Sequence, residues 1–119
     1  AYTTSFELQD ASGRSRVRLP SWLGSVAEVE VNGQLAGQCV SRPWEVDVTD
    51  LVRLGRNSVE VRVIGTLKNT LGPHHGQPTL GRAWPGAFRQ APDDGPPPGR
   101  DYHTVGYGLF AAPQLVRIR

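Results

Sequence analysis

The chain has 119 residues, 38% of them hydrophobic, and a formal net charge of +2. This is the size of one ordinary domain with a modest core. Its 14 glycines and 10 prolines favour many turns and short strands over long helices. No apolar run approaches the roughly 20 residues of a membrane span. Cys39 is the single cysteine, which excludes an intramolecular disulfide and a cysteine-based zinc site, and we expect it to be buried. Without methionine or a signal peptide, the chain is expected to be a mature product or an excised piece of a larger protein.

Alternation of apolar and polar residues predicts short strands in the first half of the chain. These strands cover residues 6–8, 16–19, 27–31, 34–37 and 45–48. Arg14, Arg16 and Arg18 alternate along one of them and should share an exposed face. A nucleic-acid surface would need a denser basic stripe with interleaved aromatic residues. We therefore expect no nucleic-acid partner, and no membrane partner.

Asn32-Gly33 lies between two of the predicted strands. Both residues accept the positive φ of a type I′ turn, so the pair predicts a tight hairpin. In such a hairpin Leu35 shares a face with Glu30 rather than with the valines. Either Leu35 points outward, or the hairpin is wider or bulged.

The next segment predicts one short helical turn over residues 49–55. Thr49 or Asp50 would cap its start, and Gly55 would close it. Residues 58–64 then form the clearest half-buried strand, because valines alternate with charged residues.

Residues 66–104 lose all periodicity and are rich in proline and glycine. A loop of this length inside a compact domain is often functional. Periodicity returns at residues 107–110, where Tyr107 is expected to be buried, and a last strand covers residues 114–119. Six to eight short strands separated by turns indicate a β-sandwich or a β-barrel.

Three runs, in this order and spacing, carry a family resemblance: residues 29–37 with Asn-Gly, residues 42–51 with Arg-Pro-Trp and Asp-x-Thr-Asp-Leu, and residues 55–63 with Gly-x-Asn before a valine-rich strand. They resemble the sugar-binding jelly-roll domain of family 2 glycoside hydrolases and related bacterial glycosidases. The resemblance implies an all-β, galactose-binding-domain-like jelly-roll sandwich. Residues 1–119 would form one such domain with one long irregular loop, 66–104.

The motif residues build the fold rather than a catalytic site. Asp47, Thr49 and Asp50 are expected to satisfy backbone donors, and Asn57 to accept a left-handed backbone conformation. In the family that the sequence resembles, the catalytic carboxylates lie in a separate barrel domain. The resemblance therefore implies a non-catalytic carbohydrate-binding-like module of a secreted or periplasmic bacterial glycoside hydrolase. Its partners would be a poly- or oligosaccharide and the catalytic domain of the parent enzyme, bound or packed beside it.

Sugar binding needs aromatic platforms and planar polar groups, and the long loop supplies both. Trp84 is the best candidate for an exposed platform, whereas Trp44 is expected to lie in the core or to anchor a loop. The other candidate ligand-binding residues accompany Trp84 in the same loop. They are Asn69, His74, His75, Arg82 and Tyr102.

Adjacent histidines such as His74 and His75 make a poor metal pair, and a zinc site would need His103 beside one of them. The aspartates of the loop could coordinate a cation, but such loops are more often simply solvated. The aspartates are Asp93, Asp94 and Asp101. We expect no cofactor and leave the metal open, since sandwiches of this type often hold a structural calcium ion.

Two other functions stay open at this point. One is a protein-interaction or adhesion sandwich without sugar binding. The other is a small metal enzyme that uses His74, His75 and an acid.

Overall fold

The computed structural model describes residues 1–75, 84–88, 95 and 99–118. The chain divides into two compact units: a sandwich unit, Ala1–Gly65 with Tyr107–Arg119, and a loop unit, Thr66–Gly106. Among the described residues, no helix is long and apolar enough to cross a membrane. The described residues of the sandwich unit form nine strands: β1 (Tyr2–Leu8), β2 (Arg14–Arg18), β3 (Trp22–Leu23), β4 (Val26–Val31), β5 (Gln34–Cys39), β6 (Glu45–Asp47), β7 (Gly55–Ile64), β8 (Gly108–Leu109) and β9 (Gln114–Ile118).

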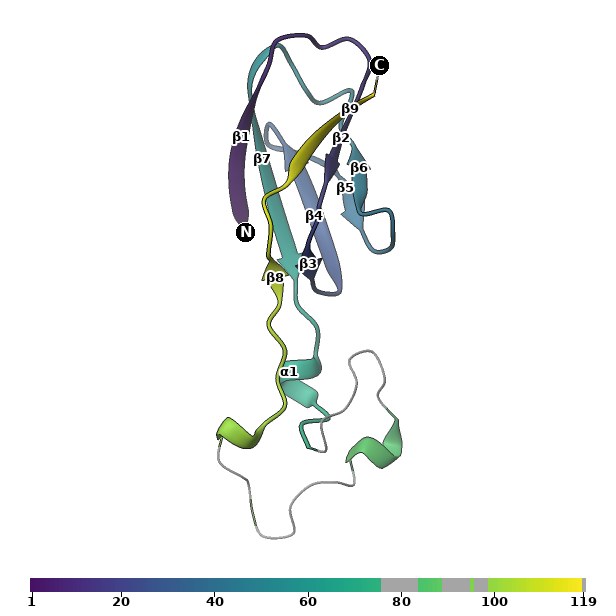
Figure 1. The fold of residues 1–119 in the computed structure, drawn as a ribbon, viewed down its shortest axis with the longest axis vertical. Helices are drawn as coiled ribbons and strands as arrows, with labels where there is room; N and C mark the ends of the chain where they lie inside the picture. Colours follow the sequence, from purple (N-terminus) through teal and green to yellow (C-terminus); the bar gives the residue numbers. More distant parts are fainter. Residues whose placement is uncertain (76–83, 89–94, 96–98, 119) are drawn as a thin grey trace. The chain divides into compact units, whose positions relative to one another are not determined.

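All strand pairs of the sandwich unit are antiparallel (Figure 1). They form a four-stranded sheet in the order β1-β7-β4-β5, a three-stranded sheet in the order β6-β2-β9, and the short pair β3-β8. This arrangement confirms the predicted all-β sandwich.

Valines from both larger sheets meet in one core. Alternate residues of β4 and β7 are fully buried, as the period of two predicts. Each such side chain contributes about 1.5–3 kcal/mol relative to an exposed position. The buried members are Val17, Leu19, Ala27, Val29, Val31, Cys39, Val46, Val48, Val59 and Val61.

The hairpin between β4 and β5 combines the two alternatives that its sequence left open. Asn32 (φ 52°) and Gly33 (φ 81°) form the predicted tight turn, and Leu35 points outward with 60% of its surface exposed. The register then shifts at Ala36, which has no partner on β4. The extra residue reverses the facing of the rest of β5. Cys39 therefore points into the core, and burial raises the pKa of its thiol.

Asn57 is fully buried and makes four hydrogen bonds with its side chain. Its Oδ1 accepts from the Arg53 backbone N–H and from Asn32 Nδ2, both at 2.9 Å. Its Nδ2 donates to the carbonyls of Arg53 (2.7 Å) and Gly55 (2.9 Å). The expected left-handed conformation of Asn57 is wrong, because Asn32 is the only described non-glycine residue with a positive φ. Its amide, not its backbone freedom, serves the fold.

The predicted helical turn after β6 is a hydrogen-bonded turn, in which Val52 N–H donates to the Val48 carbonyl at 3.1 Å. Asp47, rather than Thr49 or Asp50, caps it. Its Oδ1 accepts from the Thr49 backbone N–H (3.0 Å) and hydroxyl (2.6 Å). These two hydrogen bonds lower the pKa of Asp47.

The C-terminal strands differ from the prediction in two respects. Trp22 and Leu109 pair across β3 and β8, a two-residue ladder too short for any sequence period to reveal. Tyr107 is 54% exposed, so the prediction that it is buried is wrong. On β9, Leu115 packs against the core.

The loop unit contains short helical segments that the sequence did not predict. They are α1 (Lys68–Leu71), η1 (Pro85–Phe88) and η2 (Gly99–Asp101).

We predict that Asn57→Ala lowers the free energy of unfolding by about 2–4 kcal/mol, because it leaves buried backbone groups of residues 53 and 55 without partners. Urea denaturation measures the loss. Ser58→Ala, at the exposed neighbouring position, is the control and should stay within about 0.5 kcal/mol of the wild type. Equal effects of the two substitutions would contradict this account of the amide.

Candidate functional site

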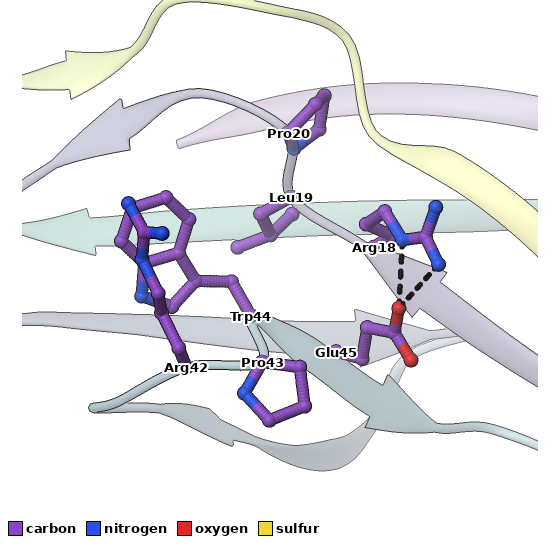
Figure 2. A pocket seen from close by; sticks show the side chains of 7 residues that line it. All are labelled: Arg18, Leu19, Pro20, Arg42, Pro43, Trp44 and Glu45. Atoms are coloured by element: carbon purple, nitrogen blue, oxygen red, sulfur yellow. Dashed lines mark hydrogen bonds and ion pairs between the residues drawn. The ribbon is translucent and has the colours of Figure 1, made fainter.

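A shallow pocket of about 560 Å³ opens on the sandwich unit where β2 ends and β6 begins (Figure 2). We call it the Trp44 pocket. The described residues that line it are Arg18, Leu19, Pro20, Arg42, Pro43, Trp44 and Glu45. The Leu19 N–H donates to the Trp44 carbonyl at 2.9 Å, and this bond holds the two lining segments together.

The Trp44 indole is half-buried and packs against the core from its inner side. Trp22 meets it edge-on, with ring centroids 5.8 Å apart and an interplanar angle of 69°. The Arg42 guanidinium carbon lies 4.8 Å from the Trp44 ring centroid, a cation–π geometry that Figure 2 shows. The prediction placed Trp44 in the core or as a loop anchor. It does pack on the core, and it also lines a pocket.

Glu45 lies between two arginines of the neighbouring strand. Its carboxylate accepts from Arg18 Nε at 2.7 Å and pairs with a second Arg18 nitrogen at 2.6 Å. Arg16 approaches the other carboxylate oxygen at 3.4 Å. The hydrogen bond from Arg18, with that from Arg16 added, holds the pKa of Glu45 below its usual range against the opposing effect of burial. Of the three β2 arginines predicted to share a face, Arg16 and Arg18 thus form ion pairs with Glu45 of β6.

The chemistry of the Trp44 pocket suits binding rather than hydrolysis. Glycoside hydrolysis uses two carboxyl groups at a defined separation. Among the described lining residues, Glu45 is the one carboxylate, and two guanidinium groups already engage it. An aromatic ring beside planar hydrogen-bonding groups is the arrangement by which proteins hold sugars.

A second, polar depression of about 510 Å³ lies over β1, the β4–β5 turn and the start of β7. Arg53 and Arg56 both line it, and the Arg56 guanidinium lies 3.5 Å from the Ser5 hydroxyl. We call it the Arg56 depression. The described residues that line it are Thr3, Thr4, Ser5, Asn32, Arg53, Arg56 and Ser58. It holds no aromatic platform among these residues.

In the loop unit, the structure brings together three of the residues predicted to bind ligand. The Tyr102 ring lies 5.1 Å from the His74 ring and 5.6 Å from the His75 ring, centroid to centroid. His74 Nδ1 lies 3.2 Å from the His103 carbonyl oxygen. These contacts order the unit, and they leave the binding role of the three side chains a prediction.

Of the other three predicted site residues, the structure describes Asn69 and Trp84, which have different environments. Both polar atoms of the Asn69 side chain bond to the Val105 backbone, at 2.7 and 2.8 Å, so this amide joins two segments of the unit. Trp84 is 64% exposed, as a platform should be, and its ring lies directly over Gly86. Arg82 lies outside the described residues.

Lys68, which sequence reasoning missed, has a central place in the loop unit. Its ammonium group donates to the Pro73 carbonyl and, at 2.7 Å, to the His103 carbonyl. Burial lowers its pKa. It is the single lysine of the chain, and that isolation in an arginine-rich composition was the one signal available.

The zinc arrangement considered from the sequence depended on His103 lying near His74 or His75. The fold does place it there, since the His103 N–H donates to the His74 carbonyl at 2.8 Å. Among the described residues, however, no group of three or more His, Cys, Asp or Glu side chains could hold a metal ion. Asp93 and Asp94 lie outside the described residues. The structural calcium ion stays a prediction.

No protein-family model matches the chain, and no curated protein matches it. Among solved structures, the chain is similar to part of a rhamnosidase from Novosphingobium sp. PP1Y, with 27% identity and a TM-score of 0.62. This match covers 96% of the chain and 10% of the rhamnosidase.

Two weaker likenesses share the glycosidase setting. A β-glucuronidase from Bifidobacterium dentium is 29% identical, with a TM-score of 0.46, over 53% of this chain and 11% of that one. A glycosyl hydrolase family 2 member from Bacteroides cellulosilyticus is 26% identical, with a TM-score of 0.45, over 54% and 9%. The rhamnosidase match confirms the predicted resemblance to a domain-sized part of a glycosidase.

We predict that Lys68→Met raises the amide exchange rate of the loop unit by about tenfold or more, because two carbonyls lose a charged donor. Hydrogen exchange of peptides covering residues 68–75 and 99–106 measures this rate. Arg100→Met removes the same charge from a side chain that is 84% exposed, and it should leave both peptides unchanged. Unchanged exchange in Lys68→Met would show that the ammonium group does not hold the unit together.

Proposed function

We propose that the chain is a non-catalytic carbohydrate-binding module of a larger glycoside hydrolase, and that the Trp44 pocket is its sugar site. One observation carries the proposal: an indole ring and the guanidinium groups of Arg18 and Arg42 line one open pocket. The pyranose face is apolar and its rim is polar, so this combination of groups matches a sugar ring.

The similarity to one tenth of a rhamnosidase supports the module role. The chemistry would then belong to another domain of the parent enzyme, which is the proposed protein partner. The proposed setting is a secreted or periplasmic bacterial enzyme acting on a poly- or oligosaccharide. By binding that substrate, the module would raise its effective concentration at the catalytic domain.

The loop unit is the rival location, because Trp84 is exposed there and the sequence favoured it. The two sites make different demands on mutagenesis. A Trp44 site fails when the indole that precedes β6 is lost, whereas a Trp84 site is insensitive to that change.

We expect Trp44→Leu to weaken glycan binding by about tenfold or more, because it removes the ring that lines the pocket and orients Arg42. Affinity electrophoresis in gels containing a panel of neutral and acidic polysaccharides measures the retardation, and isothermal titration with oligosaccharides gives the affinity. Trp44→Phe keeps an aromatic face and should retain part of the binding. Because Trp44 also packs on the core, urea denaturation of each variant must show that it is folded under the conditions of the binding assay.

Trp84→Ala is the matched control and should bind like the wild type. Loss of binding in Trp84→Ala with retention in Trp44→Leu would move the site to the loop unit. If the folded wild-type chain binds no polysaccharide of the panel, the carbohydrate-binding proposal is wrong.

A further inference from the structure

We propose that the Trp44 pocket selects acidic saccharides, those whose sugar rings carry a carboxylate, over neutral ones. This inference rests on the proposed function and names its ligand class. Two guanidinium groups line the pocket with a single described carboxylate, and one of these groups, Arg42, is held on the Trp44 ring; this juxtaposition carries the inference.

The charge of the pocket is the first step. Glu45 is its one described carboxylate, and Arg18 and Arg16 both engage it. Its negative charge is therefore already compensated. Two guanidinium groups, those of Arg18 and Arg42, line the pocket against this single carboxylate. An anion gains more from this unpaired positive charge in a half-buried site than in water, because the dielectric constant of the site is lower. A neutral sugar has no such gain.

Arg42 is the second step. Its guanidinium lies over the Trp44 ring, and no described carboxylate lies within ion-pair distance of it. Stacking on an indole is a way to hold this flexible side chain in one orientation while its N–H groups stay free. A planar guanidinium edge matches the two oxygens of a carboxylate in a bidentate pair. Arg42 is thus a pre-oriented cation without a counterion among the described residues.

The unpaired Arg42 and the Trp44 ring that orients it would act on the same ligand. A sugar in the pocket would meet the Arg42 guanidinium that lies over the Trp44 ring, and a ring carboxylate would lie near the Arg42 and Arg18 groups that line the same pocket. The Arg56 depression has cations and hydroxyls but lacks the aromatic platform among its described residues. It would attract anions without recognising a sugar, and it therefore supplies a matched control.

Isothermal titration of the folded chain tests the inference with four probes: galacturonate and mannuronate trimers, and the galactose and mannose trimers that share their rings without the charge. We expect at least one uronate trimer to bind about tenfold or more tighter than its neutral counterpart. The difference should shrink as salt is raised, because the partly exposed charges are screened.

Three substitutions then locate the effect. Arg42→Ala should weaken uronate binding by about tenfold, and Arg42→Lys, which keeps the charge but loses the planar edge, should restore only part of it. Glu45→Gln should tighten uronate binding by about threefold, since it removes the competing carboxylate and keeps an acceptor for Arg18. Arg56→Ala removes the same charge as Arg42→Ala and should leave the affinity within about twofold.

The outcomes separate the two proposals. If neutral trimers bind at Trp44 as tightly as uronates, the acid preference is wrong and the carbohydrate-binding function stands. If Arg56→Ala weakens uronate binding as much as Arg42→Ala, the preference reflects general charge and the assignment to the pocket fails. If no saccharide binds the folded chain, both proposals fall together.

Discussion

The buried Asn57 amide is the contact on which the rest of the sandwich unit depends. It bonds to Asn32 in the β4–β5 hairpin and to the backbone between residues 53 and 55. Asn32 in turn bonds to the Leu51 carbonyl and to the Ser58 N–H. One network therefore joins the hairpin to the connection between β6 and β7. The network thus anchors the chain before β5 and the chain after β6, the two strands that flank the segment carrying Trp44.

The strands and the hairpin could be predicted because they rest on local periodicity and on one turn type. Asn57 shows where such inference stops. Asparagine near a glycine turn can serve through a left-handed backbone or through its amide, and the sequence pattern is the same for both. Only the arrangement of the surrounding carbonyls decides, and here the amide is used. Leu35 and the bulge at Ala36 gave a similar ambiguity, because a local alternation cannot say whether one residue is extra.

The site was harder to predict than the fold, because its parts are brought together by strand register. Arg18 and Glu45 are opposite each other on β2 and β6, although 27 residues separate them in the chain. Their pairing cannot be derived from either segment alone, whereas the Arg42 stacking joins two residues of one segment. The long loop drew attention through its composition, which signals function only on average. There, Asn69 turned out to bond the backbone of Val105 and so to hold the loop unit together.

The polar side chains of the proposed Trp44 pocket differ from those elsewhere in the chain in how far their bonding capacity is satisfied. Polar side chains that are satisfied within the structure, such as Asn57, Asn69 and Lys68, stabilise it and have little bonding capacity left for a ligand. Arg42 differs because an aromatic ring orients it while no described acid neutralises it. The Trp44 ring serves both purposes, packing inward on Trp22 and lining the pocket outward. In the proposed function, stability and recognition therefore meet in one side chain, and the unpaired charge of Arg42 beside it would set the ligand preference of the pocket.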